Sequence, residues 1–347
     1  MHAYSRLKYF YLFSIIICSW CIANYSIATA VNSKSLSTTE QKQLLVFHSG
    51  IARIDNLLVE AFKREFSKKL PSRKLEMINI HDLNPLQLKK QLGKNEHCIV
   101  TIGLNALEKT LASRTKTPIF STLVSRSKLD NLAEIYKDIG NPITGIYQEQ
   151  PFLRQVLLSK SIDSRMKNIA LILGRQNRYR LQDYKTISSN ESMQLKFNIL
   201  KLQENPSQVL SRLQLQDSFV LLLNDERHFS ENNLRSLLVT SYKNQIPFIG
   251  SKNSDSEKLA LASVYTPHNT LASESAAALV EICENKNWMQ PNYAHHFKVQ
   301  VNQQIAKHLD YAYISSSELE KQIIAMEQNR SEQIGLTVNR LDQINNE

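Results

Sequence analysis

Glycine is scarce in this chain, with only 8 glycines among 347 residues. The sequence contains no Gly-x-Gly-x-x-Gly, no Gly-x-x-x-x-Gly-Lys and no Gly-x-Ser-x-Gly motif. The first two motifs use glycine to bring the backbone against phosphate groups, and the third exposes a nucleophilic serine at a sharp strand-to-helix turn. Their absence argues against a nucleotide-binding enzyme and against an α/β-hydrolase.

Clusters typical of metal binding or catalysis are also missing. The four cysteines show no metal-site spacing. The adjacent His295 and His296 would point apart in a strand or a helix, so one ion rarely binds both. Asp225, Glu226 and His228 could form an acid–base cluster, but acidic residues are also favourable where a helix begins, as one does shortly afterwards. We predict no catalytic residue, no metal site and no cofactor.

The first thirty residues have the pattern of a secretory signal. Arg6 and Lys8 precede an uncharged apolar stretch, and residues 28–30 (Ala-Thr-Ala) supply the small-x-small site that signal peptidase cleaves. The alternative, a membrane anchor, would need about 20 apolar residues, and this stretch is shorter. We predict that residues 1–30 are a cleaved signal peptide, that no later segment crosses a membrane, and that the protein is periplasmic.

The charge balance is basic, with a formal net charge of +10. The lysines and arginines are scattered over predicted helices, with only short pairs such as 68–69 and 89–90. We therefore interpret them as solvated surface rather than as an interface for nucleic acid. Cys98 and Cys283 remain after residue 30, and they could pair in an oxidising compartment or be two buried thiols.

Short apolar runs alternate with helical patterns along the rest of the chain. The runs predict strands, and apolar recurrence at i, i+3 and i+4 between them predicts helices. The predicted strands are residues 44–47, 75–80, 98–103, 118–124, 143–147, 168–173, 197–200, 219–223, 247–250 and 259–265. Continuous apolar strands separated by helices are typical of parallel sheets covered on both faces. We predict an α/β fold of two Rossmann-like lobes with parallel sheets, joined by a hinge.

The rhythm of strands restarts midway along the chain, which suggests how the chain is divided. The predicted regions are the signal peptide 1–30, an N-terminal lobe of 42–140 plus 268–312, a C-terminal lobe of 141–267 and a polar helical tail of 313–347. Residues 143–147 and 259–265 are expected to cross between the lobes. In the tail, Leu319, Ile323 and Met326 could dock on the body or contact a partner.

The ends of the predicted strands supply the candidate binding residues. In parallel α/β sheets, ligands bind beyond the carboxyl ends of strands, where loops and helix N-termini offer N–H donors. Two facing lobes would place both sets of ends around one cleft. The candidates, which could equally be ordinary turn residues, are Ser49, Gly50, Gly103, Leu104, Ser125, Gly174, Arg175, Asn224, Asp225, Ser251, Lys252 and Tyr265. Arg175 and Lys252 would favour an acidic group on the ligand.

Six stretches occur in a recognisable order. They are Cys-Ile-Val-Thr-Ile-Gly-Leu-Asn-Ala-Leu (98–107), Thr-Pro-Ile-Phe-Ser (117–121), Asn-Pro-Ile-Thr-Gly-Ile (141–146), Lys-Asn-Ile-Ala-Leu-Ile (167–172), Ile-Pro-Phe-Ile-Gly-Ser (246–251) and Ala-Leu-Ala-Ser-Val-Tyr (260–265). Together they resemble the ABC transporter substrate-binding protein family with the type I periplasmic fold, in particular its tryptophan- and tyrosine-binding members. The resemblance spans roughly residues 42–312.

This resemblance implies a non-enzymatic, monomeric protein that closes two lobes over a small molecule and delivers it to an ABC permease in the inner membrane. We therefore expect the periplasmic solute-binding component of an ABC-type uptake system, with an amino acid or organic acid as ligand. The alternative is an orphan periplasmic binding protein that signals to a membrane partner. A neighbouring permease gene would favour the first function, and a neighbouring sensor kinase or cyclase the second.

Overall fold

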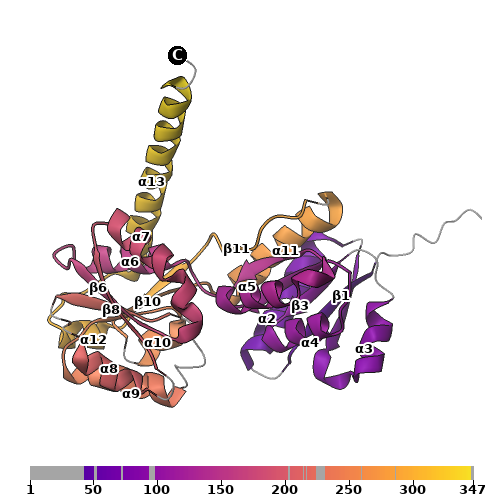
Figure 1. Cartoon of the computed structure of the whole chain (residues 1–347), viewed down its shortest axis with the longest axis horizontal. Helices are drawn as coiled ribbons and strands as arrows, with labels where there is room; N and C mark the ends of the chain where they lie inside the picture. Colours follow the sequence, from indigo (N-terminus) through magenta and orange to yellow (C-terminus); the bar gives the residue numbers. More distant parts are fainter. Residues whose placement is uncertain are drawn as a thin grey trace, which may run out of the picture. The chain divides into compact units, whose positions relative to one another are not determined.

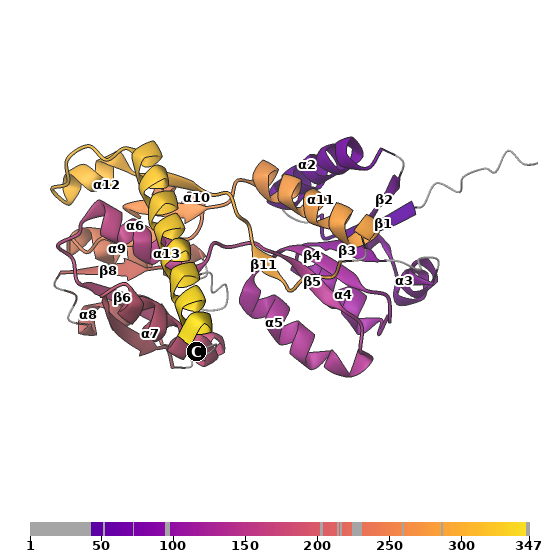
Figure 2. The ribbon, with the colours of Figure 1, turned by 90° about the horizontal axis from the view of Figure 1, so that it is seen from above.

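A computed structural model describes residues 43–344, apart from 51–52, 72, 94–97, 202–203, 214, 216, 224–230, 259 and 286. The predicted signal peptide lies outside the described residues, and so do Asn224 and Asp225. The described chain forms two α/β halves, each built on its own six-stranded sheet (Figures 1 and 2).

The first half contains a sheet with the strand order β11-β5-β4-β3-β1-β2. The strands are β1 (Gln43–His48), β2 (Lys74–Asn79), β3 (Ile99–Ile102), β4 (Ile119–Val124), β5 (Ile143–Tyr147) and β11 (Asn292–Tyr293). The helices are α2 (Arg53–Lys69), η1 (Ile80–Asp82), α3 (Pro85–Leu92), α4 (Leu104–Ala112), α5 (Arg126–Ile135), η2 (Lys137–Ile139) and α11 (His268–Asn285). The pairings of β1 with β3, β3 with β4, β4 with β5 and β5 with β11 are all parallel.

The second half contains a sheet with the strand order β12-β10-β9-β8-β6-β7. The strands are β6 (Asn168–Leu173), β7 (Gln194–Ile199), β8 (Ser218–Leu221), β9 (Phe248–Gly250), β10 (Ala262–Tyr265) and β12 (Lys298–Val301). The helices are α6 (Phe152–Ile162), η3 (Arg175–Arg180), α7 (Leu181–Asn190), α8 (Pro206–Arg212), α9 (Glu231–Lys243), α10 (Asn253–Lys258), α12 (Gln303–His308) and α13 (Ser316–Ile344). Only the edge strand β12 runs antiparallel to its neighbour among the described pairings. The predicted α/β class with two parallel-dominated sheets is confirmed.

Apolar residues on both faces of each sheet explain why helices cover both sides. In β1, Leu44 and Val46 pack with α2 and α11, whereas Leu45 and Phe47 pack with α3, α4 and α5. Successive strand residues point to opposite faces, so a continuous apolar run requires a helical layer on each. Each such fully buried side chain stabilises the fold by about 1.5–3 kcal/mol relative to exposure.

Local sequence determines where several elements begin and how closely they approach. Asn84 and Gln87 form a capping box, and Pro85 occupies the first turn, so these residues fix the start of α3. In β5, a Cβ on Gly145 would overlap the Ser121 carbonyl of β4. Glycine is therefore required there by the closeness of the two strands.

Strand pairing places two segments differently from the sequence-based division into lobes. β5 pairs with β4, so residues 143–147 belong to the first sheet, although they were counted with the C-terminal lobe. β12 pairs with β10, so residues 298–301 belong to the second sheet, although they were counted with the N-terminal lobe. The sequence predicts a strand at 143–147 but not its neighbours, and it predicts no strand at 298–301, so only the register of pairing shows which sheet each segment joins. We propose that the halves meet at residues 148–151, 266–267 and 294–297, hereafter the connecting segments.

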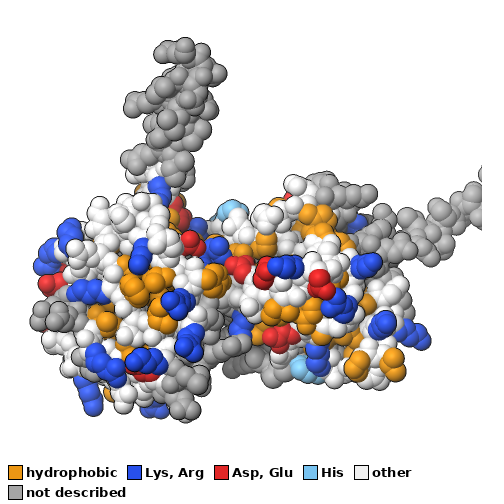
Figure 3. Space-filling model, viewed as in Figure 1, with side chains coloured by type: hydrophobic (Ala, Val, Ile, Leu, Met, Phe, Trp, Pro, Cys, Tyr) orange, Lys and Arg blue, Asp and Glu red, His pale blue; other side chains and the backbone are white. Residues whose placement is uncertain are grey.

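The described residues also show how apolar the helices are and how the basic side chains are distributed. Among the described residues, no helix is long and apolar enough to span a membrane. On the face shown in Figure 3, lysine and arginine side chains are dispersed among uncharged and apolar ones. Such dispersal fits a solvated surface better than a concentrated basic interface.

Candidate functional site

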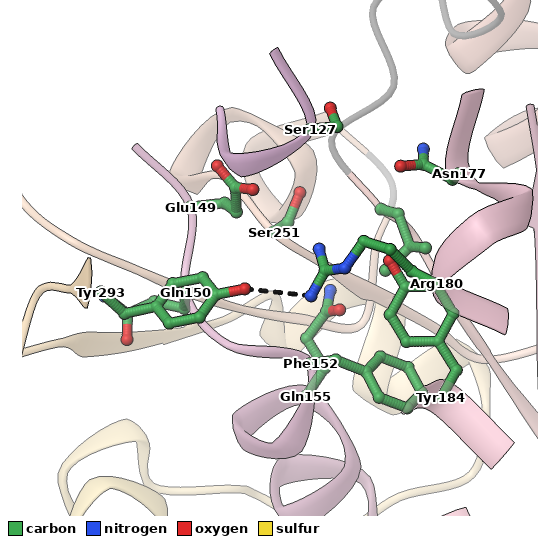
Figure 4. Close-up of a pocket in the computed structure, with 11 residues that line it drawn as sticks. Ser127, Glu149, Gln150, Phe152, Gln155, Asn177, Arg180, Tyr184, Ser251 and Tyr293 are labelled. Carbon is green, nitrogen blue, oxygen red and sulfur yellow. Dashed lines mark hydrogen bonds between the residues drawn. The ribbon is translucent and has the colours of Figure 1, made fainter. Parts of the chain in front are cut away.

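A small cavity lies beside two of the connecting segments (Figure 4). Its lining residues are Ser127, Glu149, Gln150, Phe152, Gln155, Asn177, Arg180, Tyr184, Leu223, Ser251 and Tyr293. The free space is about 30 Å³, which holds roughly one or two water molecules. A larger molecule would enter only if these side chains moved apart.

Two arginines converge on one tyrosine at this cavity. Arg180 Nη2 donates to the Tyr293 hydroxyl at 3.2 Å (Figure 4), and Arg126 Nη1 donates to the same hydroxyl at 3.3 Å. Arg126 also bonds Asp130 through its Nε at 3.3 Å. Arg180 is only 8% exposed, and its Nε is buried with no hydrogen-bond partner among the described residues. Asp130 therefore balances only one of these two positive charges.

Glu149 brings a carboxyl group to the same cavity. Its Oε1 accepts a hydrogen bond from the backbone N–H of Arg126 at 2.9 Å, whereas its Oε2 is buried without a hydrogen-bond partner among the described residues. Burial raises the pKa of Glu149 to about 7, although the Arg126 N–H favours the charged form. Near neutral pH, this carboxyl group can thus be either a proton donor or an anion.

Aromatic and amide groups complete the lining. The rings of Phe152 and Tyr184 lie 4.7 Å apart, and the Arg180 guanidinium is 5.2 Å from the Tyr184 ring. The Gln155 amide is held by a 2.8 Å bond to the Leu222 carbonyl. The cavity therefore combines charged groups with flat apolar walls, a combination typical of small-molecule sites.

Most predicted site residues of the first half lie at strand ends but away from this lining. Ser49 is buried, and its Oγ lies 3.5 Å from the Ile102 carbonyl. Gly50 and Gly103 have φ of 63° and 90°, so both serve turns that glycine favours. Leu104 opens α4, directly after Gly103. Ser125 comes nearest, because its Oγ lies 3.4 Å from that of Ser127 in the lining.

The predicted residues of the second half are also dispersed. Ser251 lines the cavity, and its N–H and that of Lys252 both donate to the Asp255 carboxylate at 3.0 Å. Gly174 precedes η3, and Arg175 is an exposed residue of that helix. Tyr265 ends β10, where burial raises its pKa. Asn224 and Asp225 lie outside the described residues.

Sequence reasoning did not select Glu149, Arg180 or Tyr293. Glu149 lies two residues beyond β5. A search of residues that follow each strand would have selected it if 143–147 had been assigned to the first sheet. Tyr293 lies in the two-residue strand β11, which is too short to have a periodic pattern. Arg180 ends a 3₁₀ helix six residues beyond Gly174, and nothing in its local sequence distinguishes it from Arg175 or Arg178.

The histidines and cysteines considered in the sequence as metal ligands or a disulfide are placed as follows. Among the described residues, no group of three His, Cys, Asp or Glu side chains could hold a metal ion. The backbone N–H groups of His295 and His296 donate to the two carboxylate oxygens of Glu274, at 2.7 and 2.9 Å. Cys98 is buried, and the side chain of Cys283 lies outside the described residues, so their pairing stays a prediction.

Comparisons with known proteins agree with this architecture. Residues 44–320 match the family model described as ABC transporter substrate binding protein. No curated protein matches the sequence. Similar solved structures include the ligand-free, open form of CD0873, a substrate binding protein with adhesive properties from Clostridium difficile, at 16% identity and a TM-score of 0.60, covering 79% of this chain and 96% of that one.

Two further structures have the same fold. A conserved domain protein from Vibrio cholerae has 15% identity and a TM-score of 0.57, with 81% of this chain and 98% of that one covered. A domain from Streptococcus pneumonia in complex with L-Trp has 14% identity and a TM-score of 0.56, with the same coverage of 81% and 98%. These likenesses extend over nearly the whole of each solved chain, and they show the type I periplasmic binding fold.

Proposed function

This chain belongs to the ABC transporter substrate-binding protein family, and on that premise we propose that it captures a small solute in the periplasm and delivers it to an ABC permease of the inner membrane. Members of this family bind their substrates and typically do not transform them. The predicted signal peptide supports export. The proposed outcome of binding is transfer of the unchanged solute.

One observation carries the proposed site. Glu149 Oε2 and Arg180 Nε are buried, face one cavity and lack hydrogen-bond partners among the described residues. Buried polar atoms are normally satisfied, so two such atoms at one cavity indicate a polar guest. The opposite characters of the carboxyl group and the guanidinium suit the ammonium and carboxylate of an α-amino acid.

The walls favour an aromatic or otherwise apolar side chain on that amino acid. Phe152, Tyr184 and Tyr293 offer ring faces and edges to a flat group. The similar Streptococcus domain was solved with L-Trp, which makes L-tryptophan a reasonable first probe. Because the free space is about 30 Å³, the lining side chains must first move apart to admit an amino acid, as they would in an open form of a two-lobed receptor that then closes over the solute.

Mass spectrometry of solute released from gently purified protein tests the proposal, followed by thermal-shift titration. L-tryptophan at 100 times its dissociation constant should stabilise the chain by about 2.7 kcal/mol. Tryptamine, which lacks the carboxylate, and indole-3-propionate, which lacks the ammonium, serve as matched controls and should give a much smaller shift. Equal shifts with all three compounds, or no shift with any amino acid or organic acid, would contradict the proposed site.

A signalling role is the second candidate, and one observation favours it. The helix α13 continues to Ile344, whereas the family match ends at residue 320. A helix that extends beyond the shared fold suits contact with a further protein. Co-purification of the full chain with its genomic neighbours distinguishes the two functions, because a permease and ATPase support uptake, whereas a sensor kinase or cyclase supports signalling.

A further inference from the structure

Arg154, on the first turn of α6, makes an unusual set of contacts outside the cavity. Its Nε donates to Glu327 Oε1 at 2.8 Å and its Nη2 donates to Glu327 Oε2 at 3.1 Å, so the pair is bidentate. Its Nη1 donates to the Ala294 carbonyl at 3.0 Å and also to Gln150 Oε1. The side chain is only 11% exposed, and its guanidinium lies 4.4 Å from the Phe297 ring.

These contacts join all three connecting segments. Gln150 belongs to residues 148–151, and its Nε2 donates to Thr266 Oγ1 in the second connecting segment. Ala294 and Phe297 begin and end the third. One hydrogen-bonded chain therefore runs from Thr266 through Gln150 to Arg154, and from there to Ala294. Because Gln150 also lines the cavity, this series of hydrogen bonds touches the proposed binding site.

Through Glu327, Arg154 also connects these hydrogen bonds to α13. Glu327 lies one helical turn beyond Ile323, which is fully buried, as Leu319 nearly is. A second pair, between Arg330 and Glu191 at the end of α7, holds the same stretch of helix. That pair does not involve a connecting segment. Glu327 and Arg330 thus attach α13 to two different parts of the second half.

We propose that Arg154 couples the cavity to α13. The guanidinium has a fixed fork of donors, and a movement of Gln150 or of Ala294 changes the geometry available to Glu327. Coupling is reciprocal, so a molecule that displaces α13 changes the connecting segments, and a solute that displaces Gln150 changes α13. Arg154 is a positioning residue in this device, because it does not line the cavity.

The coupling is a property of the chain without solute, and it rests on the proposed function only for the identity of the molecule that moves Gln150. Amide hydrogen exchange of the full chain therefore tests it directly. Three reporter amides are hydrogen-bonded in or beside the connecting segments: Gln148 N–H to the Val124 carbonyl, and the N–H groups of His295 and His296 to Glu274.

Glu327→Gln is the test variant, and Arg330→Gln is its matched control on the same helix. The glutamine keeps an acceptor but leaves the mostly buried Arg154 charge without its carboxylate. We expect exchange at the three reporter amides to become at least about fivefold faster in Glu327→Gln and to stay within about twofold of the native rate in Arg330→Gln. Exchange in β6 of the second sheet monitors global opening and should be unchanged in both variants.

Equal exchange at the reporters in both variants, or faster exchange confined to α13, would overturn the coupling. If Glu327→Gln also loosens β6, the milder Arg154→Lys decides the matter, because lysine keeps the charge but cannot hold Glu327, Gln150 and Ala294 together. Unchanged reporters in that variant would overturn the proposal as well. Failure of the chain to bind L-tryptophan would count against the proposed ligand and leave these exchange rates unaffected.

Discussion

The guanidinium of Arg180 donates a hydrogen bond to the Tyr293 hydroxyl at 3.2 Å, and so joins η3 of the second half to β11 of the first sheet. The same hydroxyl accepts from Arg126. One phenolic oxygen is therefore an acceptor for two cationic donors beside the candidate binding cavity.

Replacing this acceptor should destabilise the chain. Tyr293→Phe keeps the ring, whose centroid lies 4.9 Å from that of Tyr147, but it removes the oxygen. Hydrogen bonds that involve a charged group contribute about 1.5–3 kcal/mol, and partial exposure reduces this, so we expect a loss of about 1–2 kcal/mol in urea unfolding. Tyr313→Phe, at a side chain that is 82% exposed, is the control and should be neutral. A loss of equal size at both positions would contradict the role of the hydroxyl.

Ionisation of Glu149 should make stability depend on pH. Its folded pKa of about 7 lies above the 4.5 of an unperturbed glutamate, so folding favours the protonated form. This contribution is fully present below about pH 4.5 and is lost as pH rises towards 7 and beyond, amounting to about 3 kcal/mol for a shift of this size. Glu149→Gln removes the titration, so the free energy of unfolding of the variant relative to the native chain should rise over this window. Parallel stability curves between pH 4.5 and 7.5 would show that Glu149 has an ordinary pKa.

Arg180 and Arg175 lie on the same 3₁₀ helix but should differ in solute binding. Arg180 is buried at the cavity, whereas Arg175 is exposed. Losing one partner of a buried charged hydrogen bond costs about 2 kcal/mol or more, so Arg180→Met should weaken L-tryptophan binding by at least about thirtyfold in calorimetric titration. Arg175→Met should bind within about twofold of the native chain. The reverse ranking would restore Arg175 as the ligand-binding residue.

Gly145 and Gly140 should respond very differently to alanine. A Cβ at Gly145 overlaps the Ser121 carbonyl, while one at Gly140 meets nothing within 4 Å. Overpacking of a rigid backbone should cost about 3 kcal/mol or more at Gly145. At Gly140, which has a φ of 72°, only the left-handed conformation is strained, at about 1 kcal/mol. Urea unfolding of the two variants measures both values, and similar losses would mean that β4 and β5 can separate.

Periodicity in the sequence was sufficient to predict the fold, because buried strands such as 98–103 and 168–173 are continuous apolar runs. Those runs need a helical layer on each face, and the structure has one on each face of both sheets. Periodicity was not sufficient to assign β5 to its sheet, and it did not predict β12 as a strand. The placement of both depends on pairing with β4 and β10, which are distant partners that no local pattern encodes.

The candidate site was harder to predict for a related reason. Of the predicted strand-end residues, Ser251 lines the cavity and Ser125 lies beside Ser127 of the lining. Side chains such as Arg180 and Tyr293 approach each other across 113 residues of sequence. Their juxtaposition depends on how the two halves are connected, and residue type alone gave no reason to prefer Arg180 over Arg175.

Neither half is one continuous stretch of polypeptide, since β11 and α11 return to the first sheet before β12 closes the edge of the second. A ribosome therefore finishes the first sheet only after it has made nearly all of the second. A gene fragment that stops after β10 would lack the edge strands β11 and β12 and the helix α11. Expression of either half alone requires splicing two distant coding segments.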